Sequence, residues 1–188
     1  EKIVIDIDTL INGDEFGTQK KTVTIISDDP LPKMTLSVGS TSINEIGTTV
    51  VTATVSEVSS LDVTVSIVKA GMAIEDVDYT LGCTILFPAG ATTTSIILAP
   101  KDDSIDELNE TVVISTGNIV NGEDTSLPQT VTIVDDEVPP SVTLSVGSPA
   151  ITEDDGTTTV TATLNTTSGL NVTVTLVSTG DAQEAVVE

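Results

Sequence analysis

Short runs in which apolar and polar residues alternate recur along the chain, a pattern typical of β-strands with one buried face. Seven such runs lie between residues 34 and 134, separated by turns rich in glycine, proline and aspartate. We place the strands at 34–38, 48–55, 63–68, 84–87, 94–98, 110–115 and 129–134. Seven short strands in about a hundred residues predict an all-β fold, an antiparallel β-sandwich of the immunoglobulin type.

The chain also repeats itself with a period of about 108 residues. Thr35 begins the segment TLSVGSTSINEIGTTVVTATVS, and Thr143 begins its near copy, TLSVGSPAITEDDGTTTVTATLN. Thr22 begins TVTIISDDPLP, and Thr130 begins TVTIVDDEVPP. We therefore predict tandem modules: residues 1–29 form the C-terminal part of one module, 33–137 a complete module and 141–188 the N-terminal part of the next. The joints between them are short and contain proline, which predicts a semi-rigid rod.

The composition restricts the partners. The net charge is −23, from 29 acidic residues and six lysines, with no arginine or histidine. Nucleic acid and anionic membrane surfaces are excluded as partners because both require a basic surface. The sequence contains no apolar run long enough to enter a membrane. Cations are the natural partners of this chain.

Catalysis is not expected. The chain has no histidine for proton transfer at neutral pH, and its one cysteine, Cys83, has no base beside it. Because Cys83 lies next to an apolar strand, we expect a buried and inert thiol. The protein is predicted not to be an enzyme.

The acidic residues outside the strands follow a regular rule of position. In an antiparallel sandwich each strand reverses the chain, so every second connection lies at the same end. Glu45, Asp78, the segment Lys101–Glu110 and the run Asp135–Glu137 all fall in connections of the same parity. We therefore expect four acidic segments to meet at one end of the complete module.

Such a cluster of oxygen ligands without histidine or cysteine selects calcium or magnesium over zinc or copper. Calcium is favoured, because six to eight oxygens from flexible loops suit its loose geometry. More than one ion is expected, since a single cation leaves most of the charge uncompensated. The alternative is that these acidic turns only keep the protein soluble.

Several motifs together resemble the Calx-beta domain, a module of sodium/calcium exchangers and of many long extracellular and bacterial-surface proteins. They are INEIGTTVVTATVS, GMAIEDVDYT, LFPAGATTTSIIL, DDSIDELNET and TVTIVDDEVP, and with the partial copies they cover essentially the whole chain. The resemblance implies calcium ligands at Glu45, Asp78, Asp102, Asp103, Glu107, Glu110, Asp135, Asp136 and Glu137. Ser104 and Glu137 depart from the aspartates of well-ligated members, which implies that one ion of the cluster is weak or missing. Asp106 and Lys101 are expected to face solvent, and Tyr79 to pack in the core.

The leading functional expectation is a calcium-binding structural or adhesive repeat of a long extracellular or cell-surface protein. Calcium would stiffen the module ends and joints, and the partners would be calcium, neighbouring modules and a cell-surface or matrix component. One alternative is a calcium-sensing module that regulates an attached transporter or receptor. Another is a filament subunit in which the partial modules of neighbouring subunits complete each other by strand pairing, which we expect less because strands equivalent to 84–87 and 94–98 would be missing.

Overall fold

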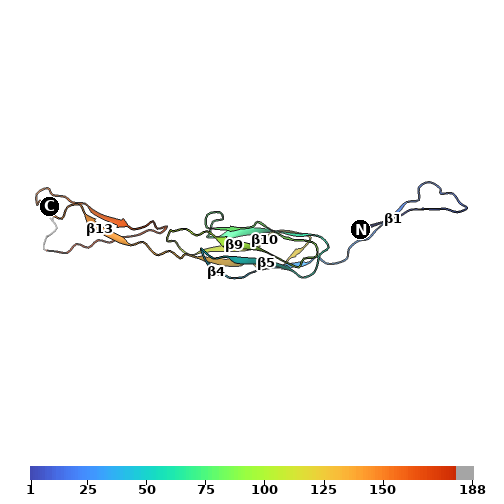
Figure 1. Ribbon diagram of the computed structural model, residues 1–188, viewed down its shortest axis with the longest axis horizontal. Helices are drawn as coiled ribbons and strands as arrows, with labels where there is room; N and C mark the ends of the chain where they lie inside the picture. Colours follow the sequence, from blue (N-terminus) through green and yellow to red (C-terminus); the bar gives the residue numbers. More distant parts are fainter. Residues whose placement is uncertain (181–188) are drawn as a thin grey trace, which may run out of the picture. The chain divides into compact units, whose positions relative to one another are not determined.

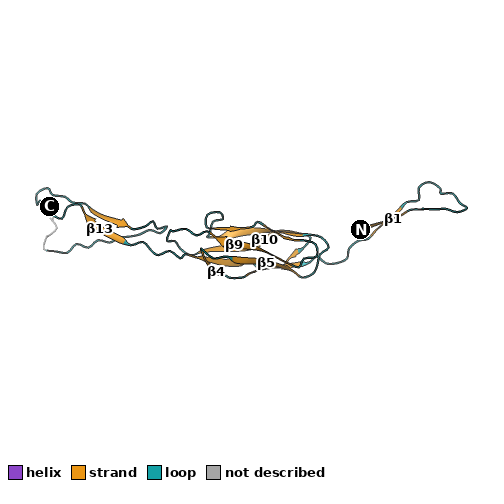
Figure 2. Ribbon diagram, viewed as in Figure 1, coloured by secondary structure: helices purple, strands orange, loops and turns teal. Residues whose placement is uncertain are grey.

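The computed structural model describes residues 1–180, which form strands and loops without any helix (Figure 2). The chain forms two compact units, Glu1–Leu31 and Pro32–Glu188. The predicted division into three modules stays a prediction, and residues 181–188 of the third predicted module lie outside the described residues. Within residues 1–180, nothing has the helical length and apolar character of a membrane-spanning helix.

Two five-stranded sheets form the sandwich of the second unit (Figure 1). One sheet has the strand order β4 (Ser42–Asn44), β12 (Gln129–Val134), β10 (Glu110–Val120), β6 (Val63–Gly71) and β8 (Thr84–Phe87). The other has the order β11 (Glu123–Asp124), β3 (Lys33–Val38), β5 (Thr49–Val55), β9 (Thr93–Pro100) and β7 (Tyr79–Leu81). The seven predicted strands are confirmed, and β4, β7 and β11 are three short additions.

The core lies between the two sheets and contains the inward residues of each alternating run. In β5, for example, Val51, Ala53 and Val55 are buried, and Val50 before them is exposed. The largest side chains that are fully buried are Tyr79, Phe87, Met34, Ile85, Leu98 and Ile114. Tyr79 is therefore a packing residue, as predicted. With so few aromatics, β-branched side chains fill most of this core.

The first strand of the sandwich changes sheets at Gly39 and Ser40. β3 pairs with β5 in one sheet, whereas β4 runs parallel to β12 in the other. The buried hydroxyl of Thr49 supports this change, because it accepts a hydrogen bond from Ser40 N (2.8 Å) and donates one to Ser40 O (3.3 Å). The change of sheet carries the chain toward Glu45 at the end of β4.

The two remaining hairpins repeat pairings found within the sandwich. β1 (Lys2–Ile5) pairs with β2 (Lys21–Thr24), and Ile3 lies opposite Val23, as Val112 lies opposite Val131 in the pairing of β10 with β12. β13 (Val142–Val146) pairs with β14 (Val160–Leu164) in the register of β3 with β5. The sequence repeat is thus also a repeat of strand register.

Cys83 is exposed, and the prediction of a buried thiol is wrong. It lies in the link between β7 and β8, before the chain enters the core at Ile85. Its carbonyl accepts a hydrogen bond from Ile67 N (2.8 Å), and its sulfur lies 3.5 Å from Lys69 Nζ. The apolar residues next to Cys83 in the sequence suggested a buried thiol. Cys83 lies before the strand in which those residues are buried, so its own side chain stays exposed.

Candidate metal centre

Four connections meet at one end of the sandwich, as the strand parity predicts. β3, β6, β9 and β12 all run toward this end, because β5, β8 and β10 pair with them antiparallel. The connections that follow these strands carry eight of the nine predicted ligands, and the ninth, Glu110, is the first residue of β10. The structure therefore brings all nine carboxylates to one end of the molecule, although their role as ligands stays a prediction.

One group of carboxylates consists of Glu45, Asp102, Asp136 and Glu137. One oxygen from each lies within 4.8 Å of the others, which is a suitable arrangement for a single cation. Three connections contribute: Glu45 follows β4, Asp102 follows β9, and Asp136 and Glu137 follow β12. No local sequence motif contains this set.

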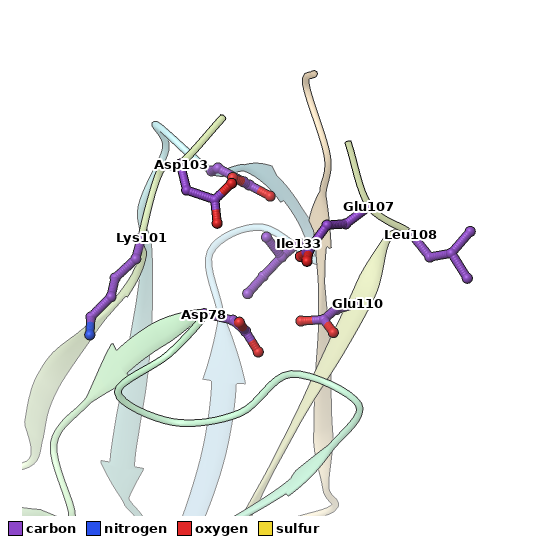
Figure 3. A pocket seen from close by; sticks show the side chains of 8 residues that line it. Asp78, Lys101, Asp103, Glu107, Leu108, Glu110 and Ile133 are labelled. Atoms are coloured by element: carbon purple, nitrogen blue, oxygen red, sulfur yellow. The ribbon is translucent and has the colours of Figure 1, made fainter. Parts of the chain in front are cut away.

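A second group lines a small pocket next to the first. The pocket is lined by Glu45, Asp78, Lys101, Asp103, Glu107, Leu108, Glu110 and Ile133. Figure 3 shows the carboxylates of Asp78 and Glu110 facing each other, with Asp103 above them and the Lys101 and Leu108 side chains directed away. Glu45 belongs to both groups. The two groups therefore form one continuous acidic centre.

Asp78 is positioned by the chain reversal that follows β6. Gly71, at the end of β6, has a φ of 120°, and a Cβ there would lie 2.0 Å from Thr111 O. Only glycine fits, which lets the same carbonyl accept hydrogen bonds from both Met72 N (2.9 Å) and Ala73 N (3.1 Å). Further along, Asp78 Oδ2 accepts a hydrogen bond from Ile74 N (2.5 Å), which orients the carboxylate.

Backbone hydrogen bonds shape the acidic segment Lys101–Glu110. Asp103 Oδ1 accepts a hydrogen bond from Ile105 N (2.7 Å), and Asp135 Oδ1 accepts one from Glu107 N (2.9 Å). Asn109 Oδ1 in turn accepts a hydrogen bond from Asp135 N (3.2 Å). The segment is therefore tied to the exit of β12 at two points.

Burial first, and the charge of neighbouring carboxylates second, raise the pKa values of several glutamates in this centre. Burial raises the pKa of Glu45 to about 7, against a hydrogen bond from the Asp103 backbone, and the charge of Glu137 adds to the rise. Burial also raises the pKa of Glu110 to about 7, and the neighbouring Asp78 carboxyl group raises it further. At neutral pH each of these two groups is therefore partly protonated.

Two further glutamates have raised pKa values, again through burial first and neighbouring charge second. The strongest neighbouring charge is Asp103 for Glu107, and Asp136 for Glu137. Oε2 of Glu137 is shielded from solvent and has no hydrogen-bond partner within residues 1–180. Because an unpaired, desolvated carboxylate oxygen is costly, this atom fits a site that receives a cation.

The lysines do not neutralise this centre. Lys101 lines the pocket, but its Nζ donates to the carbonyl of Asp76. Lys69 pairs with Glu75, and this is the one salt bridge found in the part of the chain that the structure describes. These two lysines therefore do not neutralise the negative charge at this end of the sandwich.

The donor set fits calcium. All donors are hard carboxylate oxygens from several loops, which is the chemistry of calcium and magnesium sites. Glu45, Asp102, Asp136 and Glu137 would hold one ion, and the pocket carboxylates of Asp78, Asp103, Glu107 and Glu110 would hold another beside it. A bound divalent cation would supply charge neutralisation and cross-linking of the four connections.

Asp106 is buried, and the prediction that it faces solvent is wrong. Its side chain is 8% exposed and accepts a hydrogen bond from Ser168 Oγ (2.9 Å). Lys101 is exposed, as predicted. Sequence reasoning also missed the positioning role of Asn109, whose Asn-x-Thr triplet is a common chance occurrence in so threonine-rich a chain. Its position two residues after a proposed ligand was the available signal.

No protein-family model matches the chain, and no curated protein matches it in sequence. Among solved structures, it is similar to the apo-form Calx CBD1 domain, with 22% identity and a TM-score of 0.48, over 57% of this chain and 100% of that one. It is also similar to the calcium binding domain CBD12 of CALX1.1, with 18% identity and a TM-score of 0.48, over 72% of this chain and 71% of that one. A third such structure is CBD12 from CALX1.2, with 24% identity and a TM-score of 0.47, over 56% of this chain and 44% of that one.

Proposed function

We propose that the chain is a non-enzymatic, calcium-binding repeat of a long extracellular or cell-surface protein, in which calcium stiffens the module end and the joint that follows it. The observation that supports this most is the convergence of four connections on the acidic centre. The last of them, Asp135–Glu137, is also the beginning of the joint to the next predicted module. An ion held there links the ends of the loops to the start of the joint.

Calcium acts by removing repulsion. Without a cation, carboxylates from different connections repel one another, and the repulsion favours open loops. With a cation bound, Glu45, Asp102, Asp136 and Glu137 are held within a few ångströms. Because the ion binds the folded centre only, it stabilises the fold in proportion to the logarithm of its concentration over Kd.

The role as a structural repeat requires only weak sites. At extracellular calcium concentrations, sites with Kd values of about 10⁻⁴ to 10⁻³ M are substantially filled. The sensor alternative requires Kd values of about 10⁻⁵ M or lower. The two roles can therefore be distinguished by calcium affinity. They cannot be distinguished by which residues are the ligands.

Calorimetric titration of the chelator-stripped chain with CaCl₂ tests the proposal. We expect more than one calcium per chain, with Kd values in the weak range, and much weaker binding of MgCl₂. Absence of calcium binding at millimolar concentrations would contradict the proposal, and micromolar or tighter sites would support the sensor instead. The intact mass of the native protein tests the filament alternative, which requires a mass near 19.3 kDa.

A further inference from the structure

A turn of the third predicted module contacts the acidic segment of the complete module. Ser168 Oγ donates a hydrogen bond to Asp106 Oδ2 (2.9 Å), and Gly169 N donates one to Asp106 O (3.0 Å). Asp106 and Ser168 also form a β-bridge, although they are 62 residues apart. Asp106 and Thr49 are the two buried polar side chains of the described residues, and the turn accounts for the burial of Asp106.

The turn keeps its own shape by a hydrogen bond from Leu170 N to Ser168 Oγ (3.1 Å). The equivalent turn of the complete module has the same bond, from Leu61 N to Ser59 Oγ (3.0 Å). The repeat aligns Ser168 with Ser59 and Gly169 with Ser60. The turn itself is thus a repeated feature, whereas the glycine is specific to the third module.

Gly169 permits the close approach of the two modules. A Cβ at this position would lie 2.9 Å from Glu107 Oε1, 3.0 Å from Glu107 Cγ and 3.4 Å from Asp106 O. The contact with Oε1 is too short and the contact with Cγ is tight, so a larger residue shifts the flexible end of the Glu107 side chain. A serine, as at Ser60, would therefore displace the Glu107 carboxylate.

Glu107 is therefore held from two sides. Its backbone N donates to Asp135 Oδ1 (2.9 Å) on one side, and its side chain lies against Gly169 on the other. Figure 3 shows the Glu107 side chain directed into the pocket. Contact with the following module thus sets the position of a carboxylate in the acidic centre.

We propose that the turn Ser168–Leu170 of the following module is a positioning element for the calcium centre, and that Gly169 leaves the space that the Glu107 side chain occupies there. The proposal rests on the proposed calcium function. Docking of the turn preorganises Asp106 and Glu107, so it strengthens calcium binding. Because coupling between two binding events is reciprocal, calcium strengthens the docking by the same factor.

The test uses the whole chain and calcium alone. Ser168→Ala removes the hydroxyl that reaches Asp106, and Gly169→Ala displaces Glu107. Ser59→Ala and Ser60→Ala are the matched controls, because they change the equivalent turn of the complete module, for which no bond to an acidic loop occurs among the described residues. In calorimetric titrations with CaCl₂, we expect both third-module variants to bind calcium about 5-fold more weakly, and both controls to bind like the wild type.

A second measurement follows the joint directly. Amide hydrogen exchange at Gly169, measured by NMR, reports the hydrogen bond from Gly169 N to Asp106 O. We expect calcium to slow this exchange in the wild type by about the factor that the variants lose in affinity. Equal calcium affinity in the wild type and both variants, or exchange at Gly169 that does not respond to bound calcium, would overturn the coupling alone. A wild type that binds no calcium would overturn the proposed function, and the coupling with it.

Discussion

The side chains of Asp78 and Glu110 face each other at the acidic end of the sandwich (Figure 3). Burial first, and the neighbouring Asp78 carboxyl group second, raise the pKa of Glu110 to about 7. The pair lies where the loop after β6 meets the first residue of β10. Under the proposed function, protons and calcium compete for the oxygens of this pair.

The first prediction concerns the pH dependence of the calcium-free fold. Glu45 and Glu110 have pKa values of about 7 in the folded state, above their ordinary value of 4.5. The folded state therefore binds more protons than the unfolded state between these values, and stability falls as the pH rises through that range. We expect the melting temperature of the metal-stripped chain to fall between about pH 4.5 and pH 8, measured by circular dichroism. A rise over that range would contradict the raised pKa values.

The second prediction is that calcium displaces protons. At pH 6 most of Glu45 and Glu110 is protonated, because their pKa values are about 7. Calcium binds the carboxylate form, so binding at this pH releases about one to two protons per chain, and near pH 8 almost none. Calorimetry in buffers with different ionisation enthalpies measures this number. Binding at pH 6 without proton release would show that neither residue is a ligand.

The third prediction concerns Glu45, which belongs to both groups of carboxylates. Glu45→Gln removes one charge from each group, so calcium affinity falls by about tenfold or more. The same change relieves repulsion in the calcium-free state, so the free energy of unfolding rises there by about 1 kcal/mol after allowance for solvent screening.

Glu57→Gln is the control for this pair of effects, because Glu57 is exposed and lies in the connection between β5 and β6, at the other end of the sandwich. Glu57→Gln changes the net charge by the same amount as Glu45→Gln. We expect it to change neither the calcium affinity nor the free energy of unfolding of the calcium-free state. Equal effects of the two substitutions would mean that total charge matters and the centre does not.

The fourth prediction concerns Gly71, whose φ of 120° and close contact with Thr111 O exclude a side chain. Gly71→Ala lowers the free energy of unfolding by about 1–3 kcal/mol from backbone strain and displaces the loop that carries Asp78, so calcium affinity also falls. Gly90→Ala is the matched control, since Gly90 has a φ of 90°, a Cβ added there would meet no atom within 4 Å, and the residue lies between β8 and β9, at the other end of the sandwich from Asp78. Chemical denaturation and calcium titration of both variants measure the effects. Normal calcium affinity in Gly71→Ala would show that this reversal does not position Asp78.

Much of the sandwich was predictable from the sequence. Each strand buries one face, so apolar residues recur at every second position along it. Thr84–Phe87 matches its prediction in full, since Ile85 and Phe87 alternate with exposed neighbours. β4, β7 and β11 are two or three residues long, too short for such a period to show. They form because longer neighbouring strands offer them hydrogen-bonding edges.

The gathering of the acids at one end was also predictable, because it depends only on strand number and direction. The environment of Asp106 was not, because its partner Ser168 lies 62 residues away in the next predicted module. Nor was the position of Asn109, whose amide oxygen meets the backbone of Asp135. Contacts between distant loops leave no periodic signal in the sequence.

The effect of calcium on thermal unfolding tests whether cations hold together the four connections at the acidic end of the sandwich. At a calcium concentration of about ten times Kd, which is about 1–10 mM for the proposed sites, the stabilisation is about 1.4 kcal/mol for one site, which predicts a rise in melting temperature of about 5 °C. We expect this rise on adding CaCl₂ to the metal-stripped chain at pH 7.5, and its reversal by a chelator. A melting temperature that is unchanged at millimolar calcium would contradict this role of cations.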